Sequence, residues 1–334
     1  MKTPVGIIGF RGYSGAELIH ILDRHPHLEP VLLEHREGEG AGPQVGKTPR
    51  KLAYSPEVVR ENGLAAVLLA TPPEVSMDLT GPILAAGAKV VDLSGAFRLG
   101  TVDRYKRWYK ENHTQPELLA EAVYSVPEFH RNLVPGARLI SNPGCYPTAA
   151  NLALRPLLAA GAIDRRHGIV CDAKSGVSGA GRKPSLKTSF CEVTENFSVY
   201  SVLDHRHVPE VLETSGIDES EFSFTAQLLP VHRGILETIY FKASSDISTA
   251  QDLHQIYLRA YGEEPFLRIY PLGALPDLRA VSGKNYCDIG IKFDPGTKRT
   301  VVLSVIDNLV KGAAGQAIQN LNLALGLPET AGLL

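Results

Sequence analysis

The run Gly9-Phe10-Arg11-Gly12-Tyr13-Ser14-Gly15 decides the fold of the first half of this chain. It follows Val5–Gly9, an apolar stretch typical of a buried strand, and leads into Ser14–Arg24, where apolar residues recur at helical spacing. Glycines between a strand and a helix let the backbone approach a pyrophosphate, whose charge the helix N-terminus stabilises. Three glycines exceed what one tight turn needs. The pattern predicts a dinucleotide-binding βαβ unit that continues into the strand Glu29–Glu34.

Strands and helices alternate through the rest of the first half. Short apolar runs occur at Ala65–Ala70, Lys89–Leu93 and Arg138–Ser141, and helical stretches such as Glu74–Ala86 separate them. Buried strands joined by helices are typical of parallel sheets. The sequence therefore predicts an α/β fold with a Rossmann-type, doubly wound parallel sheet.

Longer runs rich in β-branched and aromatic residues follow after about residue 150. They lie at Glu221–Val231, Ile235–Ala243, Cys287–Phe293 and Thr300–Ile306, and they predict an α+β domain with a mainly antiparallel sheet. Helices such as Thr249–Tyr261 are expected to cover one face. We expect a dinucleotide-binding domain at 1–147 and a substrate-binding, catalytic and oligomerisation domain at 148–307, with the amphipathic helix 308–325 packing back on the first.

Length and composition narrow the class of protein. The 334 residues suffice for about two domains, and 44% hydrophobic residues with a net charge of −2 are typical of a soluble globular protein. The near-neutral charge argues against nucleic acid or a membrane surface as a partner. We recognise no secretory leader and no apolar run of about 18 residues in the sequence, so we expect a cytoplasmic protein. Four scattered cysteines form no disulfide framework and no zinc knuckle.

The identity of the dinucleotide depends on residues near the glycine run. Glu34 ends the second predicted strand, where an acid would hold a ribose 2′-hydroxyl. Arg36 follows it closely and Arg11 lies within the run, and either arginine could reach a 2′-phosphate or be solvated. Both NAD and NADP remain open on these residues, with the two cations favouring NADP.

A reactive cysteine is predicted within the run Ser141-Asn142-Pro143-Gly144-Cys145-Tyr146-Pro147-Thr148. Cys145 stands between a strand and a helix that we expect to begin near Pro147. A helix N-terminus lowers the pKa of a thiol from its usual value of about 8.5. The backbone N–H groups there can also stabilise an oxyanion. The alternative is an inert, buried cysteine.

A pair of histidines lies in the run Asp204-His205-Arg206-His207-Val208-Pro209-Glu210. Pro209 suits the first turn of a helix. The two histidines could ligate a metal, but no Cys or acidic ligand at diagnostic spacing accompanies them, so we expect no metal site. An exposed loop is a second alternative. A general acid/base acting beside a thiolate is the preferred interpretation.

Cations near small residues indicate an anion-binding site. Lys174 and Arg182 flank a loop rich in Gly and Ser that follows a strand, and Arg98 stands near the end of another strand. Such cations suit a phosphate or a carboxylate. The alternatives are a flexible surface loop for the first two and a surface salt bridge for Arg98.

Taken together, these motifs predict a dehydrogenase that passes through a thioacyl enzyme and exchanges phosphate. Over nearly its whole length the chain resembles the N-acetyl-gamma-glutamyl-phosphate reductases, the arginine-biosynthesis branch of the aspartate-semialdehyde-dehydrogenase-like family. The resemblance is carried by the motifs quoted above, by Asp92–Leu99, by Arg233-Gly234-Ile235 and by the run from Asn308 to Ala317.

The resemblance implies that Cys145 is the nucleophile, that His207 is the general acid/base and that Asn308 lies near the nicotinamide. It also implies NADP as the cofactor, an acyl phosphate as the small-molecule substrate, and a homodimer or homotetramer assembled through the second domain. The residues expected to bind the cofactor are Gly9, Arg11, Gly12, Tyr13, Ser14, Gly15, Arg36, Ser94 and Asn308. Those expected to bind the substrate are Arg98, Lys174, Ser178, Arg182 and His205.

The chain departs from the family pattern at two places. Phe10-Arg11 stands where Ala-Ser is usual, and Ala96 stands where an acid is usual; the first affects how the adenosine phosphate is bound and the second how Arg98 is held. Three alternative functions stay open on the sequence. They are the same chemistry on an aminoadipyl or aspartyl phosphate, a non-catalytic nucleotide sensor, and a metal-dependent hydrolase built on His205 and His207.

Overall fold

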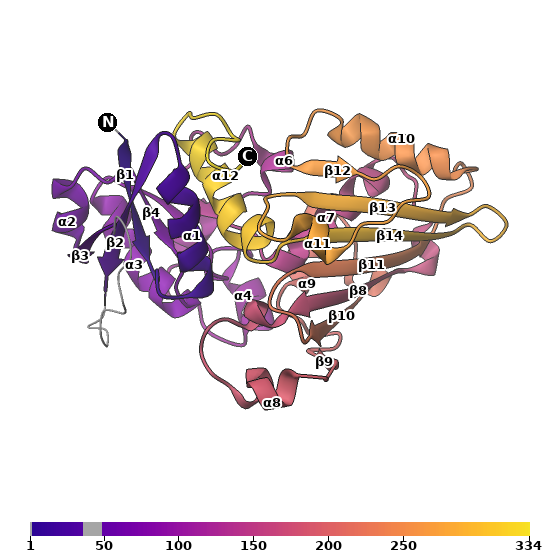
Figure 1. The fold of residues 1–334 in the computed structure, drawn as a ribbon, viewed down its shortest axis with the longest axis horizontal. Coiled ribbons are helices and arrows are strands. Elements are labelled where there is room, and N and C mark those ends of the chain that lie inside the picture. The colour runs from indigo at the N-terminus through magenta and orange to yellow at the C-terminus, as the bar shows by residue number, and fades with distance from the viewer. Residues whose placement is uncertain (1, 36–48) are drawn as a thin grey trace. The chain divides into compact units, whose positions relative to one another are not determined.

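The computed structural model describes residues 2–35 and 49–334 (Figure 1). The chain folds into two compact units. Unit 1 comprises Met1–Pro143 and Ala313–Leu334, and unit 2 comprises Gly144–Gly312. Cys145, which the expected boundary at 147 places in the first domain, therefore lies in unit 2.

Unit 1 contains a parallel sheet in which seven strands are described, in the order β3-β2-β1-β4-β5-β7-β6. The prediction of a doubly wound sheet is confirmed. The order turns back between β1 and β4, and ligands of such sheets bind beyond the carboxyl ends of the strands at that point. The strands are β1 (Thr3–Ile8), β2 (Leu28–Glu34), β3 (Arg50–Ala53), β4 (Ala66–Leu69), β5 (Lys89–Asp92), β6 (Val123–Tyr124) and β7 (Leu139–Ser141).

Helices pack on this sheet because its central strands are apolar on both sides. Ile8, Leu69 and Val90 are fully buried, and Leu18 and Ile83 of the flanking helices are buried too. Helix α12 contacts β5, α1 and α6 within this unit. The helices of unit 1 are α1 (Tyr13–Arg24), α2 (Pro56–Glu61), α3 (Pro73–Ala85), α4 (Val102–Tyr109), α5 (Pro116–Glu121), α6 (Pro127–His130) and α12 (Gly315–Ala324).

Unit 2 contains a mixed sheet with the order β12-β13-β14-β11-β8-β10-β9 among the described strands. The predicted mainly antiparallel character is confirmed, although β8 pairs in parallel with β10, and β12 with β13. The strands are β8 (Ile169–Gly176), β9 (Ser198–Tyr200), β10 (Phe222–Leu229), β11 (Ile235–Lys242), β12 (Leu267–Ile269), β13 (Cys287–Asp294) and β14 (Arg299–Ile306).

The two faces of this sheet differ in burial. Along β8, Cys171 is fully buried whereas its neighbour Val170 is 45% exposed. The buried face packs on α7 and α10, which contact β13 and β14. The other side, here called the outer face, carries Val170, Asp172 and Lys174 of β8 with Gln227, Thr238 and Tyr240 of the adjacent strands.

The helices of unit 2 are α7 (Cys145–Ala159), α8 (Phe190–Val193), α9 (Val208–Ser215), α10 (Ala250–Tyr261) and α11 (Leu278–Val281). Short helical turns occur at η1 (Arg165–His167), η2 (Val177–Ala180), η3 (Leu186–Thr188), η4 (Glu219–Glu221) and η5 (Val310–Ala314). No helix in residues 2–35 and 49–334 is long and apolar enough to cross a membrane.

Two predicted helix boundaries were wrong. Helix α7 begins at Cys145 rather than near Pro147, because Gly144 is the extended residue before the first turn. The stretch 308–325 is not one regular helix. A π-helical segment, Val310–Ala314, precedes α12, and Gly312 lets this segment approach α7, since a Cβ there would lie 2.8 Å from the Cβ of Cys145.

Candidate active site

Cys145 is the first residue of α7. Gly144 precedes it with φ −68° and ψ 157°, and no side chain caps this end of the helix. An uncapped N-terminus presents the positive end of the helix dipole and backbone N–H groups. Thr148 closes the first turn through its N–H and its hydroxyl, both of which donate to the Gly144 carbonyl. The thiol therefore stands where developing negative charge is stabilised.

The imidazole of His207 lies against the backbone immediately before Cys145. A Cβ built on Gly144 would lie 2.7 Å from Nε2 of His207, so this ring occupies the space that a larger residue at position 144 would need. His207 is 8% exposed and stands at the N-terminus of α9. The structure thus brings together the two predicted catalytic residues, which are 62 positions apart in the chain.

Substitution of Gly144 tests this close approach. Alanine adopts φ −68° without strain, so Gly144→Ala should fold, but its methyl group displaces the His207 ring. We expect kcat to fall about 100-fold, because small misplacements of catalytic groups have effects of that size, with little change in the free energy of unfolding. Gly136→Ala is the control, since a Cβ there meets nothing within 4 Å. Equal activity of the two variants would contradict the geometry.

Glu210 fixes the backbone of Gly144, the residue before Cys145. Its Oε2 accepts a hydrogen bond of 2.9 Å from the Gly144 N–H, and its carbonyl accepts from Asn151 Nδ2. The side chain is 2% exposed. Because Glu210 lies one turn after His207 on α9, this contact ties the start of α9 to the start of α7. The sequence motif contained Glu210, but no role was predicted for it.

His205 lies in an aromatic cluster beside His207. Its ring contacts Tyr146, Tyr200 and Phe224. Its Nδ1 accepts a hydrogen bond of 3.2 Å from the backbone N–H of His207. Burial, and secondarily the charge of Arg206, lower the pKa of His205 to about 4. His205 is therefore neutral at neutral pH and shapes the turn that presents His207; it does not supply a positive charge to a ligand.

This lowered pKa makes stability depend on pH. Between pH 6.5 and about 4 the unfolded chain binds a proton at this position that the folded chain does not, so stability falls as pH falls. We expect wild-type protein to lose about 2 kcal/mol more than His205→Gln between pH 7 and pH 5, measured by denaturant unfolding. His20→Gln, at an exposed position, should behave like wild type. Identical pH dependence in all three proteins would contradict the assignment.

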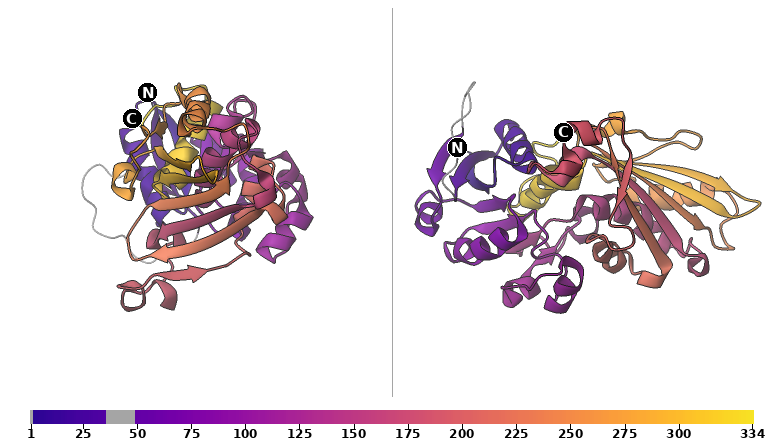
Figure 2. Two further views of the ribbon diagram at one scale, coloured as in Figure 1. Left: turned by 90° about the vertical axis from the view of Figure 1, so that its right-hand side faces the viewer. Right: turned by 90° about the horizontal axis from the view of Figure 1, so that it is seen from below.

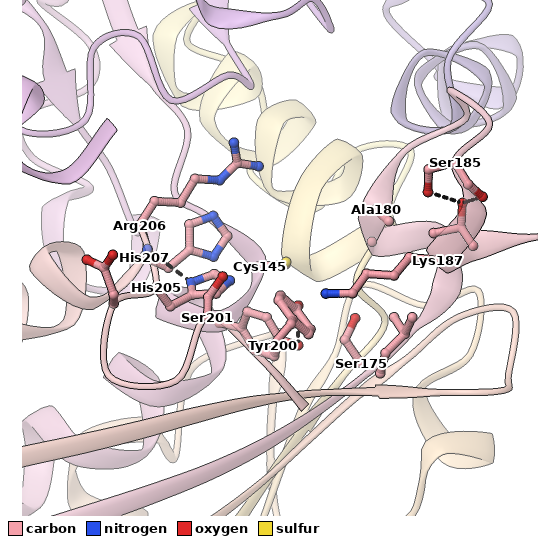
Figure 3. Close-up of a pocket in the computed structure, with 15 residues that line it drawn as sticks. Cys145, Ser175, Ala180, Ser185, Lys187, Tyr200, Ser201, His205, Arg206 and His207 are labelled. Atoms are coloured by element: carbon pink, nitrogen blue, oxygen red, sulfur yellow. Dashed lines mark hydrogen bonds between the residues drawn. The ribbon is translucent and has the colours of Figure 1, made fainter. Parts of the chain in front are cut away.

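A pocket of about 430 Å³ opens beside Cys145 and His207 (Figure 3). Figure 3 shows the Lys187 side chain extending toward Tyr200 and Ser175, while Arg206 stands next to His207. Tyr200 bonds the hydroxyl of Tyr146 at 2.9 Å, and burial raises its pKa to about 12, so it remains protonated. The pocket also includes Ser185, Thr188, Ser201 and Asp204. It combines a thiol, two imidazoles and two cations.

Two of the predicted substrate-binding cations, Lys174 and Arg182, do not line this pocket. Lys174 is on the outer face, where it pairs with Asp172, whereas its neighbour Ser175 lines the pocket. Arg182 is exposed and is not a lining residue. In unit 1, Arg98 donates to the carbonyls of Asn142 and Leu93. Lys187 and Arg206 are the cations that line the pocket, and neither was predicted.

Ser178 and Asn308 are bound to each other. Asn308 Nδ2 donates to the Ser178 hydroxyl at 3.0 Å, and Asn308 Oδ1 accepts from the Gly234 N–H at 2.7 Å. The adjacent Asp307, fully buried, accepts from Arg233 and from three backbone N–H groups. These contacts fix the chain between β14 and the π-helical segment.

In unit 1, the glycine run lies between β1 and α1 as predicted. Gly9 has φ +84°, and a Cβ there would overlap the Ala70 carbonyl; at Gly15 it would overlap the Gly9 carbonyl. Gly12 precedes α1, whose N-terminus no side chain caps. Tyr13 and Ser14 occupy the first turn. This closely packed turn before an uncapped helix fits the pyrophosphate of a dinucleotide.

A cationic cluster stands at the end of β2. Glu34 pairs with Arg11 and, at 2.7 Å, with Lys51. These two cations, Lys51 first, hold the pKa of Glu34 below its usual range. Phe10 lies under Arg11, with 5.0 Å from the guanidinium carbon to the ring centroid. Lys51 was not predicted, because it is distant in sequence, and Arg36 lies outside the described residues.

Ser94 follows β5, at the carboxyl edge of the same sheet. Its hydroxyl donates to the Asp92 carboxylate at 2.7 Å and accepts from the Ala96 N–H. Burial raises the pKa of Asp92, and the bonds from Ser94 oppose that shift. Within the described residues, no group of three or more His, Cys, Asp or Glu is arranged to hold a metal ion.

Comparisons with known proteins agree with this architecture. Residues 4–137 match the model of the semialdehyde dehydrogenase NAD binding domain, and residues 145–308 match that of the semialdehyde dehydrogenase dimerisation domain. The family is thus one whose first domain binds a nicotinamide dinucleotide.

Relatives share most of their length with this chain. An N-acetyl-gamma-glutamyl-phosphate reductase of Symbiobacterium thermophilum is 46% identical, with 100% of this chain and 98% of that protein aligned. The protein of that name from Desulforudis audaxviator is 47% identical, with 99% and 97% aligned.

Solved structures are similar in fold at lower identity. The crystal structure of aspartate semialdehyde dehydrogenase II from Vibrio cholerae, complexed with ASA, has a TM-score of 0.74 and 19% identity, with 98% of this chain and 99% of that chain covered. Aspartate semialdehyde dehydrogenase with NADP from Candida albicans has a TM-score of 0.68 and 18% identity, covering 97% and 98%.

Proposed function

The chain belongs to the N-acetyl-gamma-glutamyl-phosphate reductase family of semialdehyde dehydrogenases, and from this premise we propose that it reduces N-acetyl-gamma-glutamyl phosphate to N-acetylglutamate semialdehyde and phosphate, a step of arginine biosynthesis. The observation that carries the proposal is Cys145 at the uncapped start of α7, with the His207 ring against the preceding residue. A nucleotide sensor needs neither a nucleophilic thiol nor a general acid/base.

The first half of the reaction is acyl transfer. The Cys145 thiolate attacks the carbonyl carbon of the acyl phosphate, a C–S bond forms, and the C–O bond to phosphate breaks as phosphate leaves. The N-terminus of α7 stabilises the negative charge on the carbonyl oxygen. Glu210 keeps this turn in place through Gly144.

The second half reduces the thioester. NADPH, held at the glycine run Gly9–Gly15, would supply the hydride that reduces the carbon bonded to the Cys145 sulfur. His207 accepts the proton of the hydroxyl on that carbon as the C–S bond breaks. The aldehyde then leaves and the Cys145 thiolate is restored. His205 supports this role by accepting the His207 N–H.

NADP is the proposed dinucleotide. The glycine run fits the pyrophosphate, and Arg11 and Lys51 place two positive charges around Glu34. That excess of positive charge favours a 2′-phosphate over a ribose hydroxyl, which an unpaired acid would hold.

Lys187 is the proposed partner of an anionic group of the substrate. Loss of a charge-assisted hydrogen bond weakens binding by about 10- to 100-fold, so Lys187→Ala should raise KM by that factor with a smaller effect on kcat. Lys183→Ala is the matched control, because Lys183 is exposed in the same loop and does not line the pocket. An unchanged KM for Lys187→Ala would remove Lys187 from substrate binding.

We also propose that the protein is a cytoplasmic homodimer or homotetramer. Support for assembly comes from the outer face of the unit 2 sheet, where Val170 and Tyr240 are 45% and 43% exposed. Residues 145–308, which contain this face, match the family's dimerisation domain.

The reverse reaction tests the proposed function. NADP reduction is followed with N-acetylglutamate semialdehyde, with and without phosphate, beside the aminoadipate and aspartate semialdehydes and with NAD in place of NADP. We expect phosphate-dependent turnover that is selective for N-acetylglutamate semialdehyde and for NADP. Selectivity for another semialdehyde would change the substrate. No phosphate-dependent turnover from folded, NADP-binding protein would overturn the proposal in favour of a sensor.

A further inference from the structure

Residues 93–99, here called the 93–99 turn, follow β5 at the carboxyl edge of the parallel sheet of unit 1. The turn carries Ser94, which is expected to bind the cofactor, and Arg98, which is expected to bind an anion. Every residue of the turn except Leu93 and Arg98 is buried. A buried turn needs partners for its backbone N–H and carbonyl groups, and two different side chains supply them here.

Asp92 holds the first half of the 93–99 turn. Its carboxylate accepts from the Ser94 N–H at 3.1 Å and from the Ser94 hydroxyl at 2.7 Å. That hydroxyl in turn accepts from the Ala96 N–H at 3.0 Å. These three bonds fix Ser94, and they leave the carbonyl of Ala96 to a different partner.

His113 holds the second half of the turn. Its Nδ1 accepts from the Gln115 backbone N–H at 3.1 Å, so the proton of the neutral ring is on Nε2, which donates to the Ala96 carbonyl at 2.9 Å. The ring also lies edge-on to Phe97, with 5.6 Å between the ring centroids. His113 is 8% exposed, and burial lowers its pKa. The neutral ring therefore keeps both hydrogen bonds at neutral pH.

Two tyrosines of α4 support His113. Tyr105 and Tyr109 stack with 4.6 Å between their ring centroids, and the Tyr105 ring meets the His113 ring edge-on at 4.9 Å. The Tyr109 ring fills the space beside Gly95, where a Cβ would lie 2.1 Å from its hydroxyl oxygen. Tyr105 is part of the hydrophobic core to which α3 and α5, purple in the right panel of Figure 2, also contribute. Movement of the 93–99 turn would require these rings to move.

The path of the turn decides where the Arg98 side chain begins. Arg98 comes directly after Phe97, and its guanidinium donates to the carbonyls of Leu93 and Asn142 at 2.8 and 3.0 Å. Asn142 stands three residues before Cys145 in the chain. In the proposed reaction, the anion that leaves the carbon attacked by Cys145 is phosphate. A guanidinium suits phosphate because its planar set of N–H donors matches the phosphate oxygens.

We propose that His113 is a positioning residue that, through Ala96 and Phe97, holds Arg98 for the phosphate group of the substrate. His113 itself bonds backbone groups and contacts aromatic rings, so it acts on the phosphate through Arg98. The proposal rests on the proposed function for the identity of the anion. Because Asp92 holds Ser94 separately, loss of His113 weakens phosphate binding and spares the dinucleotide.

The test compares His113→Leu with His113→Gln and with His20→Leu. Leucine keeps an apolar side chain against the neighbouring rings but donates no hydrogen bond, whereas the glutamine amide still donates to the Ala96 carbonyl. His20, exposed on α1 of the same unit, is the control. The reverse reaction gives KM for phosphate and kcat, nucleotide titration gives Kd for NADP, and hydrogen exchange gives the protection of residues 93–99.

We expect His113→Leu to raise KM for phosphate about tenfold, the effect of weakening one charge-assisted hydrogen bond, with a smaller effect on kcat and faster exchange in residues 93–99. Kd for NADP should stay within about twofold of wild type, because separate sites contribute independently. His113→Gln should recover most of the phosphate affinity, and His20→Leu should match wild type. An unchanged KM for phosphate in His113→Leu, or an equal loss of phosphate and NADP affinity, overturns the proposal.

Two further measurements keep the test decisive. If circular dichroism shows that His113→Leu is unfolded, His113→Phe takes its place, with the same expected rise in KM and the same contradicting results. If wild type shows no phosphate-dependent turnover, the proposed function fails by itself. Inorganic phosphate is then titrated into the NADP complex by calorimetry, and equal phosphate affinity of wild type and His113→Leu would overturn the positioning role.

Discussion

Cys145→Ala is expected to lose phosphate-dependent turnover by on the order of 10⁴-fold, because no other group can form the thioester. Within the described residues, Cys145 is the cysteine that lines the pocket, whereas Cys171 and Cys287 are buried and Cys191 is exposed elsewhere. Burial also raises the pKa of Cys171 well above its usual value, which keeps that thiol protonated. Turnover is measured in the reverse direction with saturating NADP and phosphate.

The control for this loss is Cys191→Ala, which removes a thiol from the exposed side of unit 2 and should retain full activity. Both variants should bind NADP and unfold like wild type, since alanine is well tolerated at the start of a helix. Retention of more than a few per cent of the wild-type rate by Cys145→Ala would contradict the covalent scheme.

His207→Asn is expected to lower kcat by about 10²- to 10⁴-fold, the usual contribution of a general acid or base. The side chain fits the same space against Gly144 but cannot exchange a proton at neutral pH. NADP affinity should stay at the wild-type value, because the predicted dinucleotide loop belongs to unit 1 and His207 to unit 2. Kinetics and nucleotide titration on the same preparation measure both quantities.

His205→Asn separates a proton-transfer role from a positioning role. His205 is neutral and accepts the His207 N–H, so its loss should lower kcat less than His207→Asn does. Weakened NADP binding with normal turnover in His207→Asn, or equal kcat in His207→Asn and wild type, would count against the assigned role.

The sequence predicted those parts of the molecule that depend on local pattern. The glycine run between an apolar strand and an amphipathic helix leaves few alternatives to a dinucleotide loop, and the alternation of strands and helices specifies the parallel sheet. Cys145 and His207 were identified because each stands in a motif at the start of a helix. That these two side chains lie close together is visible only in the tertiary structure, in which Gly144 and Glu210 join α7 to α9.

Side-chain direction was what the sequence could not supply. Lys174 and Ser175 are adjacent in β8, and successive side chains of a strand point to opposite faces. Lys174 therefore lies on the outer face, whereas Ser175 lines the pocket. Arg98 was expected to bind an anion; its guanidinium donates to the carbonyls of Asn142 and Leu93, and an anion-binding role for it stays a prediction. Lys187 belongs to no motif that the sequence analysis could recognise. Its place in the pocket depends on the path that the chain takes through residues 185–203.

The most direct measurement of the central claim is intact-protein and peptide mass spectrometry after mixing the enzyme with N-acetyl-gamma-glutamyl phosphate in the absence of NADPH. We predict release of phosphate and one N-acetylglutamyl group bound to the peptide that contains Cys145, which hydroxylamine removes and which Cys145→Ala does not form. An acyl group on a different residue, or phosphate release with no covalent adduct at any time, would contradict the account.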